Sequence, residues 1–188
     1  MNQPSMRASY AKTIIGAAKV LEATQSAHVL DHIGPERRTR IRQRGMLEWM
    51  PAQEFCELAQ CVYEALGEAA IPFWNHCLTL SLERRLLSPL RKAALAIHGS
   101  TPAALLRRTP EAWYLVSRGC GKCTVETPSD HQLSLIFKDL PPQMTGRAMR
   151  CLWEGGSLSC VDLLHLTGYS QSHVANATTV IVETRWHP

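Results

Sequence analysis

The chain has 188 residues, of which 45% are hydrophobic and 19% charged, a composition typical of a globular protein with a substantial core. No stretch approaches the roughly 18 consecutive apolar residues of a membrane-spanning helix, which argues against an integral membrane protein of that kind. The first apolar run is closely flanked by Lys12 and Lys19, unlike a secretory leader, so we expect a cytoplasmic protein. No internal repeat or linker is evident, and the sequence predicts one domain over residues 1–188.

Residues 1–112 are predicted to be mainly helical. Apolar residues recur at helical spacing between residues 9 and 23, and Gly34 followed by Pro35 predicts a helix end and a new start. The clearest pattern is "WMPAQEFCELAQCVYEALG", where Pro51 suits a first turn and Gly67 an end. Two further helical patterns follow, and Thr101 is expected to cap a short helix.

Residues 113–188 are predicted to have the order strand–strand–helix–strand–strand. "KCTVE" and "QLSLIFK" alternate apolar and polar residues on either side of the turn-rich "TPSDH". "PPQMTGRAMRCLWEGG" returns to a helical pattern, and two more strands are expected in "SLSCVDLLHLTG" and "ATTVIVETRW". The fold class is therefore α+β, with an N-terminal helical lobe packed on a roughly four-stranded antiparallel sheet and one helix between the strand pairs.

Five stretches between residues 47 and 186 resemble known proteins: "LEWMPAQEF", "LLRRTPEAWYLVSRGCGKCTVE", "LIFKDLP", "LWEGGSLSCVDLLHLTG" and "VETRW". They resemble a myxobacterial-type family of mostly uncharacterised proteins. That family in turn resembles the superfamily of haem-nitric-oxide-binding sensors, vinyl reductase-type ligand domains and TRAPP subunits. The resemblance implies a helical lobe over a twisted four-stranded sheet, often in a homodimer, enclosing a pocket for haem or an acyl-like ligand.

The cofactor chemistry of that superfamily is matched less well. Haem-nitric-oxide sensors hold the haem propionates with a Tyr-x-Ser-x-Arg motif, whereas here Tyr114 lies three residues before Ser117, and Arg118 follows directly. Adjacent strand residues face opposite sides of a sheet, so these three do not form the clamp. The paired cysteines of vinyl reductase-type domains have no counterpart in "HVANATTVIVE". The sequence therefore disfavours both haem and zinc, and leaves the cofactor unidentified.

Cys120 and Cys123 form the only Cys-x-x-Cys of the sequence. A structural zinc site usually takes two such pairs, and a thioredoxin-like pair precedes a helix, whereas a strand pattern follows here. We therefore assign no metal ligand, interpret both residues as buried thiols at the start of a strand, and keep them as the candidates for metal or redox chemistry.

An arginine-rich segment, "ERRTRIRQR", carries five of the cations behind the net charge of +4. At helical spacing Arg37, Arg40 and Arg44 share a face, which we expect to be exposed and to bind anions such as phosphate. A solvated helix face is the alternative interpretation. No recognisable nucleic-acid-binding motif accompanies the segment, so a nucleic-acid partner is disfavoured.

The helical half holds more apolar residues than one sheet face can cover, which predicts a cavity of about 300 Å³ or more between helices and sheet. A solid core is the alternative. His76 and His98 are the polar residues expected to reach the cavity. The predicted ligand-binding residues are Phe73, Trp74, Leu78, His98, Leu135 and Phe137.

The sequence thus predicts a non-catalytic regulatory or sensory module that binds a small apolar ligand or a partner protein. A homodimer or a regulatory protein is the expected partner. No serine-hydrolase, zinc-protease or phosphate-loop motif is present, so no catalytic residue is assigned. Two alternatives stay open: an interaction or assembly protein with no ligand, and a metal- or redox-active protein acting through Cys120 and Cys123.

Overall fold

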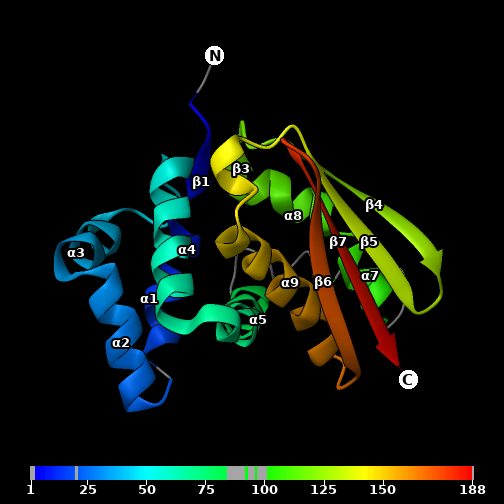
Figure 1. Ribbon diagram of the computed structural model, residues 1–188, viewed down its shortest axis with the longest axis horizontal. Coiled ribbons are helices and arrows are strands. Elements are labelled where there is room, and N and C mark those ends of the chain that lie inside the picture. The colour runs from blue at the N-terminus through cyan, green and yellow to red at the C-terminus, as the bar shows by residue number, and fades with distance from the viewer. Residues whose placement is uncertain (1–2, 20, 84–91, 93–95, 97–100, 188) are drawn as a thin grey trace.

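The computed structural model describes residues 3–19, 21–83, 92, 96 and 101–187. Helices occupy one side and the centre of the molecule, and a sheet covers the other side (Figure 1). The helical lobe contains α1 (Ala8–Ala18), α2 (Ala23–Ile33), α3 (Pro35–Gln43), α4 (Ala52–Leu66), the 3-10 turn η1 (Gly67–Ala69) and α5 (Ala70–Glu83). The second half contains α7 (Pro102–Leu106), α8 (Thr109–Val116), β4 (Lys122–Ser129), β5 (Gln132–Lys138), η2 (Pro142–Met144), α9 (Arg147–Asp162), β6 (Thr167–Asn176) and β7 (Thr179–His187).

Several helix boundaries follow from local sequence signals, as predicted. Helix α2 ends before Gly34, and α3 begins at Pro35. Helix α4 ends at Gly67, whose φ of 57° lies in the left-handed region that favours glycine. The Thr101 side chain accepts a hydrogen bond from the Ala104 amide at 3.2 Å and so caps α7.

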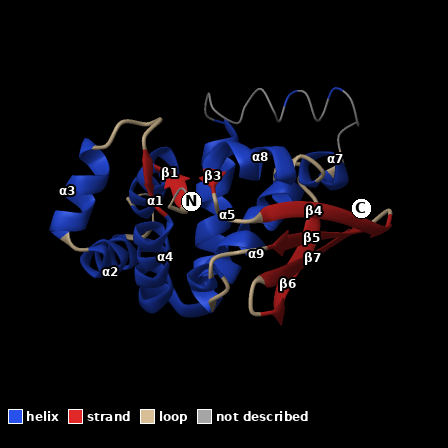
Figure 2. Ribbon diagram, turned by 90° about the horizontal axis from the view of Figure 1, so that it is seen from above, coloured by secondary structure: helices blue, strands red, loops and turns tan. Residues whose placement is uncertain are grey.

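The main sheet is antiparallel, with the strand order β4-β5-β7-β6. Leu135 pairs with Val182 and Phe137 pairs with Val180, and all four side chains are buried. Figure 2 shows the helices gathered against one face of this sheet, where α7, α8 and α9 contact it. The predicted fold class, a helical lobe on a four-stranded antiparallel sheet with one helix between the strand pairs, is confirmed.

A second, smaller sheet joins the N-terminal helices to α8. It consists of β1 (Ser5–Arg7) between β2 (Trp49–Pro51) and β3 (Ser117–Arg118), in the order β2-β1-β3. Strands of two or three residues are too short to show alternation, and the sequence analysis did not predict them. This sheet fixes β1 next to the residues that follow α8.

The third strand of the main sheet was placed wrongly by the sequence analysis. Residues 157–168 were predicted to form it, but α9 runs to Asp162 and the strand is β6, from Thr167. Gly155 and Gly156 read as a helix end, yet here they let α9 approach α5. A Cβ atom at Gly155 would lie 2.3 Å from the Ile71 carbonyl oxygen and 2.7 Å from Trp74 Cβ.

A buried acid ties α9 to its surroundings. Glu154 is 2% exposed, and it accepts hydrogen bonds from Arg147 Nη1 at 2.6 Å and from the Ser172 hydroxyl of β6. Arg147 also bonds Glu68 in η1, with 3.0 Å between Arg147 Nε and Glu68 Oε1. One guanidinium thus links α9 to the helical lobe, and one carboxylate links it to the sheet.

A search for membrane-spanning helices, restricted to the described residues, finds none of sufficient length and apolar character.

We expect Gly155→Ala to lower the free energy of unfolding by about 1–3 kcal/mol, because the added methyl overpacks the α5–α9 contact. Gly146→Ala is the matched control. Its added Cβ meets nothing within 4 Å, but Gly146 is the N-cap of α9, where alanine is less favourable than glycine, so a smaller loss of about 0.5 kcal/mol is expected. Urea unfolding followed by circular dichroism measures both variants. Equal stabilities would contradict the close contact.

Candidate functional site

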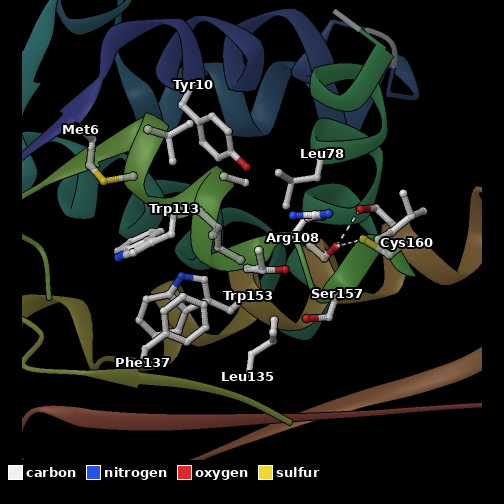
Figure 3. A pocket seen from close by; sticks show the side chains of 17 residues that line it. Met6, Tyr10, Leu78, Arg108, Trp113, Leu135, Phe137, Trp153, Ser157 and Cys160 are labelled. Carbon is white, nitrogen blue, oxygen red and sulfur yellow. Dashed lines mark hydrogen bonds between the residues drawn. The ribbon is translucent and has the colours of Figure 1, made fainter. Parts of the chain in front are cut away.

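An apolar pocket of about 110 Å³ lies between the helices and β5. Figure 3 shows side chains from β1, α1, α5, α8, α9 and β5 converging on it. The main wall residues are Met6, Tyr10, Leu78, Leu105, Arg108, Trp113, Leu135, Phe137, Leu152, Trp153, Ser157 and Cys160. This volume is well below the predicted 300 Å³ and is measured among the described residues.

Three aromatic rings form one end of the pocket. Phe137 and Trp153 are stacked, with ring centroids 4.5 Å apart and an interplanar angle of 12°. Trp113 stands edge-on to both, at 5.4 Å from Phe137 and 6.2 Å from Trp153. The rings come from α8, α9 and β5, so their contacts hold these two helices against the strand.

Three buried polar atoms of the wall have no hydrogen-bond partner among the described residues. They are Trp113 Nε1, Trp153 Nε1 and Ser157 Oγ. The neighbouring Ser159 differs, because its hydroxyl donates to the Gly156 carbonyl at 2.7 Å. An unsatisfied buried donor costs about 1–3 kcal/mol, so three residues of this wall carry polar atoms that the described side chains leave unpaired at a cost in stability.

The ionisable groups of the wall are held mostly uncharged. Burial raises the pKa of the Cys160 thiol to about 12 and raises the pKa of the Tyr10 hydroxyl above its ordinary range. Arg108 is paired with Glu111, with 2.7 Å between Arg108 Nη1 and Glu111 Oε1. The pocket therefore offers apolar surface and one cation, the Arg108 guanidinium, whose carboxylate partner Glu111 lies outside the wall.

The structure brings together only part of the predicted site. Leu78, Leu135 and Phe137 line the pocket, whereas Phe73 and Trp74 are buried in the core behind it. His98 lies outside the described residues. The expectation for His76 was wrong. Its side chain is exposed and lies, beside Asn75 and Asp162, in a separate surface hollow of about 580 Å³.

Sequence reasoning missed Ser157 and Cys160, because the segment after Gly156 was taken for a strand. Trp153 lay inside the predicted helix, but the sequence did not show that this part of the helix meets β5. A helical pattern continued through the glycines would have placed these residues on one side of α9. Met6 and Tyr10 gave no comparable signal, since the tertiary fold alone brings β1 and α1 to the pocket.

The arginine segment is less exposed than predicted. Arg37 pairs with Glu57 at 3.2 Å and Arg44 pairs with Glu54 at 2.7 Å, both across to α4, and both arginines are half-buried. Arg40 is exposed. Two of the three predicted anion-binding side chains therefore already have carboxylate partners. Anion binding at this face stays a prediction, and of the three side chains only Arg40 is exposed.

The two cysteines of the Cys-x-x-Cys are both buried. Burial raises the pKa of the Cys123 thiol to about 12 and raises that of Cys120 above its ordinary value. Gly121, between them, has a φ of 79° and lies against the Lys138 carbonyl, which accounts for the glycine by the turn. Thiol exchange needs the thiolate, which these surroundings oppose.

The residues compared with the haem clamp also separate. Tyr114 is 82% exposed, Ser117 is buried and donates to the Trp113 carbonyl at 2.7 Å, and Arg118 is exposed. None of the three lines the described pocket.

Comparison with solved structures identifies the fold. An Fe(II) unliganded H-NOX protein mutant from K. algicida matches with a TM-score of 0.64 and 11% identity, over 97% of each chain. A Cs H-NOX mutant matches with 0.62 and 12%, over 97% of each. An oxygen-binding H-NOX domain related to soluble guanylate cyclases matches with 0.59 and 12%, over 97% of this chain and 96% of that one. The chain thus has the H-NOX fold, which confirms the resemblance to haem-nitric-oxide-binding domains. No family model and no curated protein matches the sequence.

The prediction that haem is disfavoured is contradicted by these matches. Structures of the same fold include one solved to probe heme distortion in the H-NOX family. The described wall fits a haem in chemistry, because it is apolar and presents stacked rings to a flat molecule. Its volume is smaller than cofactor pockets usually have, so a haem requires a wider opening than the described side chains leave. Methionine can ligate haem iron, and Met6 lies in this wall, whereas burial opposes the thiolate of Cys160 and the phenolate of Tyr10 that haem ligation would use.

We expect Ser157→Ala to raise the free energy of unfolding of the unliganded protein by about 1 kcal/mol, because it removes an unsatisfied buried hydroxyl. Ser159→Ala removes a satisfied one on the same helix and should lower it by about 1 kcal/mol. Both changes raise helix propensity alike, so the difference in sign is diagnostic. Denaturant unfolding decides it, and two losses of equal size would show that Ser157 has a partner.

We expect one of the seven thiols to react with an aromatic disulfide reagent in the native protein at pH 8. Cys61 is half-buried, whereas the other six are buried, and burial raises the pKa of Cys56 and Cys160 to about 12. Cys61→Ser should therefore abolish the fast phase. Rapid reaction of Cys120 or Cys123, located by peptide mapping, would revive the redox alternative.

Proposed function

We propose that this chain is a sensory module of the H-NOX fold that binds a small ligand, alone or as part of a haem, in the pocket between the helical lobe and β5. One observation carries the proposal. A pocket with apolar walls lies at the meeting point of seven elements, and three of its wall residues carry buried polar atoms that have no partner among the described residues. The fold match supports it, because the matched structures include an oxygen-binding domain. His98 remains a predicted contact, and the cytoplasm remains the expected location.

The residues present divide the work of such a site. Leu78, Leu135 and Phe137 exclude water, and Trp113 and Trp153 add aromatic surface to the wall. A bound haem would supply an iron to which a diatomic gas can bind. The proposal assigns no catalytic residue.

An interaction protein with no ligand is the second candidate. The small described volume favours it, since about 110 Å³ holds a molecule of few heavy atoms at most. Metal or redox chemistry at Cys120 and Cys123 is disfavoured by the raised pKa values of both thiols. A homodimer is compatible both with the ligand-binding module and with the interaction protein.

The deciding experiment is an absorption spectrum and native mass of the purified protein, before and after titration with haemin. A stoichiometric Soret band identifies haem, and a smaller organic mass identifies another ligand. A bare mass that persists after haemin titration and after equilibration with small aromatic compounds would overturn the proposal in favour of the interaction protein. His98→Ala then tests the predicted histidine through a shift of the Soret band.

We expect Ala112→Leu, on the pocket side of α8, to weaken ligand binding at least tenfold, because the larger side chain fills the cavity. Ala27→Leu, at an exposed position of α2, is the matched control and should bind as the parent does. Equal affinities of the two variants would place the ligand elsewhere.

A further inference from the structure

Four of the six exposed large hydrophobic side chains among the described residues lie in two short segments, at Met46, Leu47, Tyr114 and Leu115. Arg7 joins these segments, because its guanidinium donates to the Leu47 carbonyl and, at 3.4 Å, to the Leu115 carbonyl. The two exposed apolar segments therefore lie next to each other. Leu47 is 67% exposed and Tyr114 is 82% exposed, and neighbouring apolar side chains that are this exposed are typical of an interaction site.

Two guanidiniums lie within this surface. Arg7 Cζ is 3.8 Å and Arg118 Cζ 4.5 Å from the ring centroid of Trp49, so both stack on the same indole. Neither arginine forms an ion pair with a described carboxylate, unlike Arg37, Arg44, Arg108 and Arg147. We call the whole set, Arg7, Met46, Leu47, Trp49, Tyr114, Leu115 and Arg118, the tryptophan surface.

The charge of the tryptophan surface selects its partner. Glu48, exposed between Leu47 and Trp49, is the one acid within these segments, so two cations face one anion. Arg7 already donates to two backbone carbonyls, so Arg118, whose guanidinium is held in a plane by stacking, is the better placed for paired hydrogen bonds to a carboxylate. Apolar side chains beside them supply the buried centre that a protein interface needs.

The same elements wall the pocket from inside. On α8, Trp113 and Val116 line the pocket while Tyr114 and Leu115 face outward, and on β1 Met6 lines the pocket while Arg7 holds the surface. Figures 1 and 2 both place β1 and β3 beside α8. A ligand that shifts α8 or β1 would therefore alter the tryptophan surface directly.

We propose that the tryptophan surface docks a partner-protein segment that carries carboxylates next to apolar side chains. This deepens the proposed sensory function, because it assigns the face through which occupancy of the pocket is reported. Docking to the unliganded protein tests the surface by itself, whereas haemin titration tests the pocket, so the two can fail separately.

The experiment uses a phage-displayed library of random 16-residue peptides, selected on the full chain. Enriched peptides are expected to combine Asp or Glu with Leu, Phe or Trp, and a labelled synthetic copy reports affinity by fluorescence anisotropy. The double variant Leu47→Ala, Tyr114→Ala should weaken binding at least tenfold. Arg118→Gln should weaken it and reduce its salt dependence. Arg7 is left intact because it bonds two backbone carbonyls.

Tyr169→Ala is the matched control, since Tyr169 is 43% exposed on β6, outside the tryptophan surface. It should bind the peptide as the parent does, and all variants should keep the parent's thermal unfolding curve. No enrichment, enrichment without acidic residues, or full affinity in the double variant would overturn the proposal. So would a dimer, seen by sedimentation, that the double variant dissociates, because a second copy would then be the occupant.

Discussion

The direct approach of α9 to the backbone of α5 is the constraint on which the rest of the structure depends. Gly155 leaves no side chain between the helices, and Trp74 packs against the space where a Cβ would lie. This contact sets the depth of α9 under the sheet. From that depth Trp153 reaches Phe137, Ser157 faces the pocket, and Glu154 reaches both Arg147 and Ser172. A wider separation would loosen the aromatic cluster and the buried ion pair together.

Local signals predicted what local interactions determine. Pro35, Gly67 and Thr101 mark helix ends in the sequence as they do in the structure, and alternation located β4 and β5. Gly155 was expected near a helix end, but its role is tertiary, because the missing side chain allows α9 to cross close to α5. Leu78, Leu135 and Phe137 were found as apolar residues on predicted faces, whereas Trp113 and Ser157 depend on how α8 and α9 are placed.

This chain shares the H-NOX fold but lacks the Tyr-x-Ser-x-Arg motif. The helices and sheet meet as in the H-NOX structures, so a cavity arises where the two layers part. Single residues determine what lines this cavity. Tyr114, Ser117 and Arg118, the residues compared with the Tyr-x-Ser-x-Arg pattern, do not line it. Motif spacing alone was therefore too narrow a basis for the inference against haem, because structures of the same fold include one solved to probe heme distortion.

The strand order has a consequence for how the chain is made. β5 lies between β4 and β7, so during synthesis one of its edges stays open until α9 and β6 have also emerged. Over that interval the apolar face of the β4–β5 hairpin has only the helices to cover it. β6, "TGYSQSHVAN", then becomes an outer strand without a single charged residue to discourage pairing with another chain. Slow translation or crowding of nascent chains would therefore favour aggregation through this sheet before β7 closes it.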